Sequence, residues 1–169
     1  MPSHFLRNYI RNVPDFPQPG ILFRDIAPLL RQAFGETIEA LSALLDAREW
    51  SQVDAVAGVE SRGFILAAAL ALRHGKGFVL VRKKGKLPPP VVELEYGLEY
   101  GTGVLEMQAG SGQLLLVDDV LATGGTLMAA ATLAERAGYQ VFQSIVLVDL
   151  RLEPPFQWDR PPVRAALTY

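Results

Sequence analysis

The sequence predicts an α/β fold in which helices flank a central, mostly parallel β-sheet within a single domain. From Val53 onward, short apolar runs alternate with helical patterns, which favours parallel strands joined by crossover helices. The apolar run 114–117 leads through a glycine-rich loop into a helical segment, an arrangement that places free backbone N–H groups at the carboxyl edge of a sheet. A length of 169 residues is typical of one domain.

The N-terminal third is predicted to be the least regular part. Ser3 can cap a short helix whose apolar positions run to Val13, before three prolines and Gly20 impose a turn-rich segment. Apolar residues at helical spacing then predict one helix over 36–50.

The later elements follow from alternating patterns. Helices are predicted over 63–73 and 125–137, with Gly138 ending the second. Strands are predicted over 53–57, 78–81, 103–107, 113–117 and 140–150. Residues 82–101 carry three successive prolines and many charges, so we expect an irregular functional lid or a disordered insert there. The proline-rich tail is expected to be loop, with a short edge strand at 164–169.

Composition excludes several classes of protein. Without cysteine there can be no disulfide framework or thiolate metal site, which suits a reducing cytoplasm. His4 and His74 have no zinc-ligand spacing. The longest apolar stretch, 64–72, is about half of the roughly 20 residues that a membrane helix needs. A net charge of −2 predicts no general affinity for nucleic acid or membranes. We therefore expect a cytoplasmic protein whose recognition of anions is local.

The segment LLLVDDVLATGGTL, residues 114–127, carries the clearest chemical signal. Gly124 and Gly125 allow the backbone to approach phosphate oxygens at a helix N-terminus, and the flanking threonines add hydroxyl donors. Asp118 and Asp119 suit the two hydroxyls of a ribose or a hydrated Mg²⁺ ion. The alternative, a plain strand-to-helix turn with capping aspartates, fits a lone Gly-Gly-Thr better than the full pattern. Neither a Walker loop nor a dinucleotide fingerprint is present.

This segment resembles the signature of the type I phosphoribosyltransferases, and the chain resembles the adenine phosphoribosyltransferase family without gaps from Asp15 to about Leu150. The resemblance is carried by DFPQPGILFRDI (15–26), GVESRGFI (58–65), VRKKGKLP (81–88), LEYGTGVLEMQ (98–108) and VDDVLATGGT (117–126). It implies a small N-terminal hood (about 1–33) and a core (about 34–169) with a mobile active-site loop (about 84–98). It also implies a magnesium requirement and a homodimer.

The resemblance implies a role for each matching residue. The 5′-phosphate would be held by Ala122, Thr123, Gly124, Gly125 and Thr126, and the ribose hydroxyls by Asp118 and Asp119, which would meet Mg²⁺ indirectly. Pyrophosphate would be surrounded by Arg62, Arg82, Lys83 and Lys86, where Arg62 would also assist catalysis by stabilising the departing charge. A solvated basic face is the alternative for Lys83 and Lys84.

The base would lie between Phe23 and Val120, read by backbone groups near Leu22 and Phe23. Arg24 would lie beside the base, unless it forms a structural ion pair with Asp25. Enzymes for 6-oxopurines place an aspartate where this chain has Ala122, so adenine is the expected base. Glu99 would act on the base from the mobile loop, next to the substrate-binding Tyr100. Glu95 competes for that role because Glu-Tyr-Gly occurs twice.

These roles predict an enzyme of purine salvage that joins adenine to the ribose 5-phosphate of phosphoribosyl pyrophosphate, giving AMP and pyrophosphate. One alternative is transfer to another purine, such as xanthine or hypoxanthine. A second is a non-catalytic regulator that binds phosphoribosyl pyrophosphate, for which the chain lacks the length and charge of an added nucleic-acid-binding domain. A third is a structural subunit without activity, which the intact acidic pair and loop disfavour.

Overall fold

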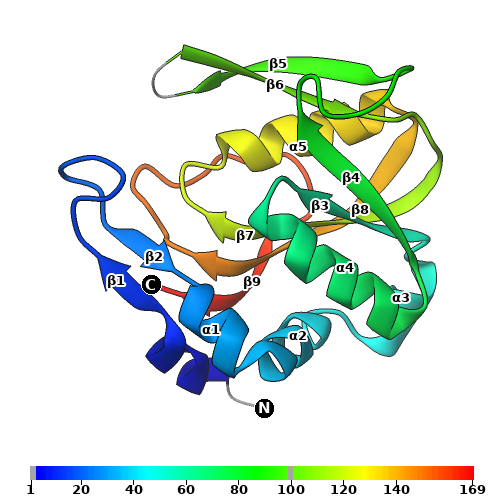
Figure 1. Ribbon diagram of the computed structural model, residues 1–169. Helices are drawn as coiled ribbons and strands as arrows, with labels where there is room; N and C mark the ends of the chain where they lie inside the picture. Colours follow the sequence, from blue (N-terminus) through cyan, green and yellow to red (C-terminus); the bar gives the residue numbers. More distant parts are fainter. Residues whose placement is uncertain (1–2, 99–100) are drawn as a thin grey trace.

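The computed structural model describes residues 3–98 and 101–169 (Figure 1). Within them lies a seven-stranded sheet in the order β5-β6-β4-β3-β7-β8-β9. The five strands from β4 to β9 in this order are parallel: β4 (Gly77–Lys83), β3 (Ala55–Val59), β7 (Gly112–Leu121), β8 (Tyr139–Asp149) and β9 (Arg164–Thr168). β5 (Val92–Leu98) and β6 (Gly101–Met107) form an antiparallel hairpin attached to β4. The predicted mostly parallel sheet is confirmed.

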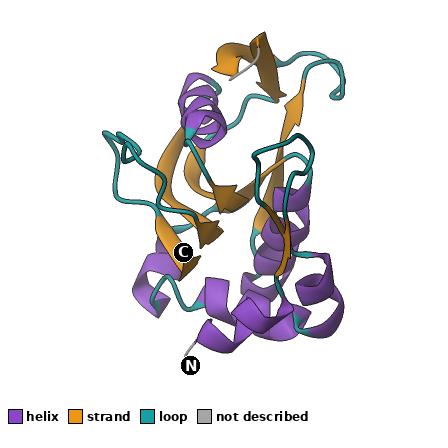
Figure 2. Cartoon of the chain, turned by 90° about the vertical axis from the view of Figure 1, so that its left-hand side faces the viewer, coloured by secondary structure: helices purple, strands orange, loops and turns teal. Residues whose placement is uncertain are grey.

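Helices cover both faces of the sheet, as the alternating pattern predicted. α4 (Arg62–His74) and α2 (Phe34–Ser42) pack in one apolar cluster, and α5 (Gly125–Arg136) packs in the other. Figure 2 shows α5 between the hairpin and the remaining strands, with most of the other helices on the opposite side. Along β7, Leu115 faces the α4 cluster and Leu114 the α5 cluster, so the strand is buried on both sides.

The predicted single helix over 36–50 is wrong. α2 ends at Ser42, and a separate helix, α3 (Ala47–Gln52), begins after Asp46. The Asp46 side chain accepts a hydrogen bond from the Glu49 N–H, and the Glu49 side chain accepts one from the Asp46 N–H. This reciprocal capping box starts a new helix where apolar spacing alone suggested continuity.

The N-terminal segment is more regular than predicted. Ser3–Tyr9 is a 3₁₀ helix (η1) that stops short of Val13, because Arg11–Val13 (β1) pairs with Phe23–Asp25 (β2) in a separate antiparallel sheet. α1 (Ala27–Gln32) follows. Leu6 and Leu29 are fully buried in the same cluster as α4, so this segment packs directly on the main sheet.

The expectation of an irregular segment over 82–101 is also wrong for most of its length. β5 pairs with β6 along its whole length, and only the stretch that contains the three prolines is a turn. Leu94 and Tyr96 pack against the α5 cluster while Glu93 and Glu95 are exposed. This period-two alternation is typical of a half-buried strand, and it was obscured by the prolines and charges beside it.

The predicted edge strand at 164–169 is confirmed as β9, at the end of the sheet beside β8. Its parallel pairing with β8 requires the tail to cross back over the sheet, and residues 150–163 make that crossing as loop. Among the described residues, no helix has the length and apolar character to cross a membrane.

Candidate active site

A cavity of about 450 Å³ lies at the carboxyl ends of β3 and β7. Parallel strands all present their carboxyl ends at one edge of the sheet, which is where α/β proteins bind ligands. Its lining comes from four parts of the chain: residues 59–62 after β3, Lys83, the hairpin residues Tyr96, Leu98 and Leu105, and residues 118–127. The structure thus brings the predicted sugar, phosphate and pyrophosphate motifs together.

The glycine-rich loop connects the end of β7 to α5. Gly124 precedes the helix with φ 88° and ψ −4°, in the left-handed region that favours glycine. Within residues 3–98 and 101–169, no side chain caps the α5 N-terminus. The first N–H groups of a helix have no partner within the helix and lie at the positive end of its dipole. Residues 122–126 all line the cavity, so this helix end is available to an anion.

Asp118 and Asp119 lie on the wall of the same cavity. Oδ1 of Asp118 accepts a hydrogen bond from the Asp119 N–H at 2.9 Å. Burial, together with the negative charge of Asp119, raises the pKa of Asp118 well above its usual range. A cation or hydroxyl donors placed in the cavity would favour the ionised form of Asp118.

Arg62 connects three elements that are far apart in sequence. It begins α4, and its Nε lies 2.8 Å from Oδ2 of Asp119, which is only 7% exposed. That oxygen is buried and has no aligned hydrogen bond within the described part of the chain, so its contact with Arg62 is an ion pair. The guanidinium also lies 4.9 Å from the centre of the Phe23 ring. Arg62 therefore joins the cavity to the N-terminal segment through a cation–π contact.

Two glutamates that the sequence reasoning missed organise the basic turn after β4. Glu60 accepts hydrogen bonds from Arg82 Nη2 at 3.0 Å and from the Lys83 N–H at 2.7 Å. Burial alone would raise the pKa of Glu60, but these bonds outweigh it and lower the pKa. Arg82 consequently faces Glu60 and the Phe64 ring, while Lys83 lines the cavity.

Glu106 organises the other half of this turn. It is 2% exposed and accepts hydrogen bonds from the N–H groups of Lys86 and Leu87 at 2.8 and 2.6 Å. Burial opposes ionisation, yet these backbone bonds lower its pKa. Lys86 is exposed outside the cavity, and Lys84 forms an ion pair with Glu93 at 3.3 Å. The sequence signal for Glu106 is an acidic residue inside an otherwise apolar strand.

Of the four residues predicted to bind the base, one lines the cavity and three lie outside it. Val120 lines the cavity, whereas Leu22, Phe23 and Arg24 do not. Arg24 donates a hydrogen bond to Asn12 and lies over the ring of the C-terminal Tyr169 at 4.2 Å.

Asp25 is paired with another residue than the sequence suggested. It forms an ion pair with Arg11 at 2.9 Å, so the alternative pairing of Arg24 with Asp25 is wrong. Glu99 and Tyr100 lie outside the described residues.

Comparison with known proteins agrees with this geometry. Residues 29–165 match the phosphoribosyl transferase domain family. The adenine phosphoribosyltransferase of Hydrogenovibrio crunogenus is 53% identical over 100% of this chain and 99% of its own length. That of Bdellovibrio bacteriovorus is 49% identical over 97% of this chain and 99% of its own.

Solved structures agree as well. The crystal structure of adenine phosphoribosyltransferase from Rhodothermus marinus superposes with a TM-score of 0.85 at 41% identity, covering 99% of this chain and 98% of that one. The Saccharomyces cerevisiae structure, complexed with an imino-altritol bisphosphate and adenine, has a TM-score of 0.83 at 34% identity over 92% of this chain and 96% of that one. With a matching domain, close relatives over its full length and the same fold, the chain belongs to the adenine phosphoribosyltransferase family.

Proposed function

We propose that this protein transfers the 5-phosphoribosyl group of phosphoribosyl pyrophosphate to adenine, giving AMP and pyrophosphate. The observation that carries the proposal is one cavity that combines the N-terminus of α5, the acidic pair Asp118 and Asp119, and Arg62. These groups suit the phosphate, the sugar and the leaving group of a single substrate. Purine salvage is the metabolic role of this reaction.

Residues 122–126 are proposed to bind the 5′-phosphate. Backbone N–H groups at the start of α5 would donate to phosphate oxygens, and the helix dipole favours their charge. The side chains of Thr123 and Thr126 line the cavity and can add hydroxyl donors. Asp118 and Asp119 would accept hydrogen bonds from the ribose hydroxyls, since ionised carboxylates are pure acceptors.

Arg62 and Lys83 are proposed to bind pyrophosphate, because both line the cavity and carry positive charge. Negative charge grows on the leaving oxygens as the glycosidic bond breaks, so fixed cations there stabilise the transition state. Arg82 and Lys86 stay proposed contacts at the edge of the site. Glu60 and Glu106 would hold the turn that carries these basic residues.

Adenine is proposed to bind between Phe23 and Val120, with Leu22 and Arg24 beside it. Phe23 contacts Arg62, which in turn contacts Asp119, so the base would lie next to the sugar site. Ala122 has no group to act on N7 of a 6-oxopurine, which supports adenine. Glu99 is proposed as the catalytic carboxylate near the base, with Tyr100 as its neighbour.

Magnesium is proposed as the cofactor. Among residues 3–98 and 101–169, no group of three or more acidic or histidine side chains could hold a metal ion by itself. This fits Mg²⁺, which keeps several waters and is usually bound through one or two carboxylates and substrate phosphates. Asp118 and Asp119 would hold it indirectly, and the ion would neutralise phosphate charge when bound.

We also infer a homodimer, because the family resemblance implies one, and a cytoplasmic location, which the cysteine-free composition favours. Sedimentation equilibrium would test the first. The expected partners are the small molecules adenine and phosphoribosyl pyrophosphate, with no nucleic acid or membrane.

The direct test is conversion of radiolabelled adenine to AMP with phosphoribosyl pyrophosphate and magnesium. Hypoxanthine, xanthine and guanine, added as competitors, should leave the rate nearly unchanged. Preferential conversion of one of those purines would overturn the assignment of the base, and binding of phosphoribosyl pyrophosphate without turnover of any purine would overturn the assignment of an enzyme.

A further inference from the structure

A second cavity of about 510 Å³ lies beside the glycine-rich loop. Leu121 and Ala122 line both cavities, so the start of the loop forms the partition between them. The outer wall of the second cavity comes from the proline-rich tail, including Phe156, Trp158 and Arg160. The loop is therefore supported on one side by the tail and open to the substrate cavity on the other.

Phe156 lies directly on the glycine at the centre of the loop. A Cβ atom added to Gly124 would meet Cδ2 of the Phe156 ring at 2.1 Å, far inside van der Waals contact. The ring also packs against Trp158, at 5.1 Å between ring centres, and against the apolar cluster around α5. Gly124 is consequently buried, although its neighbours Thr123 and Gly125 are exposed.

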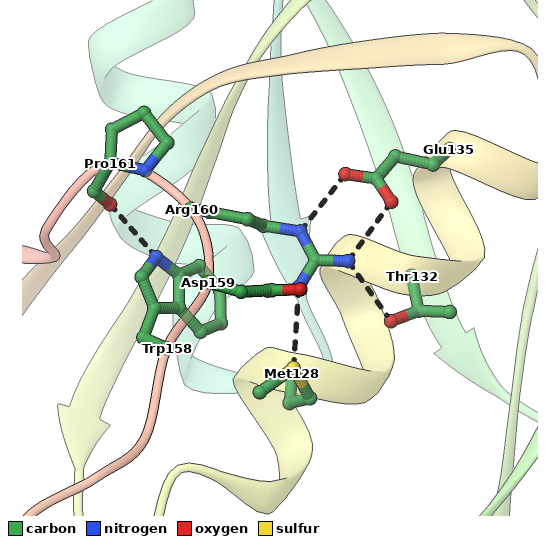
Figure 3. Close-up of polar contacts among 7 residues, drawn as sticks. All are labelled: Met128, Thr132, Glu135, Trp158, Asp159, Arg160 and Pro161. Atoms are coloured by element: carbon green, nitrogen blue, oxygen red, sulfur yellow. Dashed lines mark hydrogen bonds and ion pairs between the residues drawn. The ribbon is translucent and has the colours of Figure 1, made fainter.

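Arg160 attaches this part of the tail to α5 (Figure 3). Its Nε and Nη2 donate to the two carboxylate oxygens of Glu135, each at 2.9 Å. The same guanidinium lies 3.3 Å from Thr132 Oγ1, 3.2 Å from Met128 Sδ and 3.0 Å from Asp159 Oδ1. Paired, forked hydrogen bonds of this kind fix geometry as well as adding energy. The Arg160 side chain is only 15% exposed.

Trp158 completes the attachment. Its ring lies 5.2 Å from the Arg160 guanidinium, and its Nε1 donates to the Pro161 carbonyl at 2.8 Å. Arg160 thus binds to the body of α5, while Phe156 contacts the glycine that precedes the same helix. The tail contacts α5 from Glu135, in its last turn, to Gly124 at its N-terminal cap.

We propose that residues 151–163 brace the phosphate loop, with Arg160 and Phe156 as positioning residues for the 5′-phosphate. A loop with two adjacent glycines loses much conformational entropy when it is ordered around a ligand. A ring packed on Gly124 excludes alternative loop conformations before the ligand arrives, so less of that entropy is lost on binding. The inference rests on the proposed function of this loop.

The first test compares Phe156→Ala with Phe156→Leu. Alanine removes the ring, whereas leucine keeps an apolar side chain against Gly124. We expect alanine to raise the KM for phosphoribosyl pyrophosphate about tenfold and leucine to raise it less, with the KM for adenine and the kcat at saturation nearly unchanged. A KM for phosphoribosyl pyrophosphate within twofold of wild type in the alanine variant would overturn the brace. So would an equal rise in both KM values, because it indicates general disruption.

The second test exchanges the charges of the attachment. Arg160→Glu and Glu135→Arg should each weaken the binding of ribose 5-phosphate in calorimetry, and the double variant should recover most of the loss. Arg136→Gln is the matched control, because Arg136 is exposed on the same helix next to Glu135. Absence of recovery in a folded double variant would count against the attachment.

Binding of ribose 5-phosphate also separates the two proposals. If wild type binds it but converts no adenine, the proposed reaction fails while the brace can still be measured. If wild type binds it and Phe156→Ala binds it equally well, the brace fails and the reaction stands.

Discussion

Gly124 has a positive φ of 88° and the Phe156 ring directly against it. A side chain at this position would be strained by the backbone conformation and would also displace the ring. Nearby, Gly63 is restricted by packing alone, since its Cβ would come within 3.0 Å of the Val117 carbonyl oxygen and 3.1 Å of Asp118 Oδ1. The missing side chain of Gly63 lets α4 approach the acidic pair, and that of Gly124 lets the Phe156 ring approach the loop.

Gly124→Val should therefore weaken AMP binding at least tenfold, on the order of 1.4 kcal/mol or more. Calorimetric titration with AMP measures it. Gly35→Ala is the control, since Gly35 lies in α2 with open space around it, and alanine there should leave binding unchanged and stability equal or slightly higher. Wild-type AMP affinity in Gly124→Val would contradict the phosphate assignment.

Substitution of the acidic pair Asp118 and Asp119 should weaken ligand binding without unfolding the protein. Asp118→Asn with Asp119→Asn should weaken the binding of phosphoribosyl pyrophosphate and AMP by roughly a hundredfold or more, because hydrogen bonds to charged groups contribute about 1.5–3 kcal/mol each. The fold should persist, since Asp118 is costly to ionise where it lies. Calorimetry and thermal unfolding test both statements, and undiminished binding would remove the pair from the site.

Glu99 carries the prediction about catalysis. Glu99→Gln should lower kcat by about 10²–10⁴-fold, the usual contribution of one positioned acid–base group, with little change in affinity for phosphoribosyl pyrophosphate. Glu95→Gln is the internal control, because Glu95 is exposed on β5 and belongs to the other Glu-Tyr-Gly. If Glu95 proved essential and Glu99 dispensable, the assignment would be displaced by four residues.

At the scale of elements, the β5–β6 hairpin and the turn before it act as one unit. The hairpin supplies Tyr96, Leu98 and Leu105 to the cavity, and Glu106 on β6 holds the turn through Lys86 and Leu87. The mobility inferred for residues 84–98 stays a prediction. Movement of the hairpin would carry cavity lining and basic turn together.

Glu106→Gln should lower the free energy of unfolding by roughly 1–3 kcal/mol, because two backbone N–H groups lose a buried carboxylate acceptor. It should also raise the KM for phosphoribosyl pyrophosphate through the loosened turn. Glu93→Gln, directly opposite in the strand register, is the control and should change stability by less than about 1 kcal/mol, because its ion pair with Lys84 is exposed. If chemical denaturation showed equal losses in the free energy of unfolding for Glu106→Gln and Glu93→Gln, the stabilising role of the buried Glu106 carboxylate would be contradicted.

At the scale of the molecule, the C-terminal strand ties distant parts together. Arg164 on β9 binds both carboxylate oxygens of Glu49 on α3, at 2.9 and 2.7 Å. Arg7 donates to the Thr168 carbonyl, and the Tyr169 ring lies against both Arg7 and Arg24. The chain end therefore closes the N-terminal segment onto the sheet.

The Arg164 contact predicts how stability depends on pH. Hydrogen bonds from Arg164, and then from the Asp46 N–H, lower the pKa of Glu49 to about 2. A carboxyl whose folded pKa lies below its unfolded value of about 4.3 adds stability above that value, and the contribution is lost as pH falls toward the folded pKa. Because the pair is partly exposed, we expect about 1 kcal/mol at neutral pH.

Denaturation of wild type and Glu49→Gln at a series of pH values measures this contribution. Wild type should be more stable at pH 6, and the difference should shrink steadily toward pH 2.5. Glutamine can still serve in the capping box, so the comparison isolates the charge. Glu36→Gln, at an exposed position in the first turn of α2, is the control for the loss of a surface carboxylate. A difference that stays constant with pH would contradict the pKa of Glu49.

Patterns along the chain are enough to predict the α/β class, the parallel sheet and the strand–loop–helix that carries Asp118, Asp119 and Gly124. Each depends on residues that are adjacent in the chain, where periodicity and glycine positions act locally. The contiguous motifs were also enough to identify the family to which the chain belongs.

Contacts between residues that are distant in the sequence become visible in the folded structure alone. Arg62 lies between Phe23 and Asp119, Glu106 holds a turn twenty residues earlier, and Phe156 rests on Gly124. Such contacts depend on how strands are ordered and how helices pack, and no local pattern encodes them. The broken helix at Asp46 has a local cause instead, a capping box with Glu49 that apolar periodicity does not register, whereas the strand hidden in the charged segment depends on its pairing with β6.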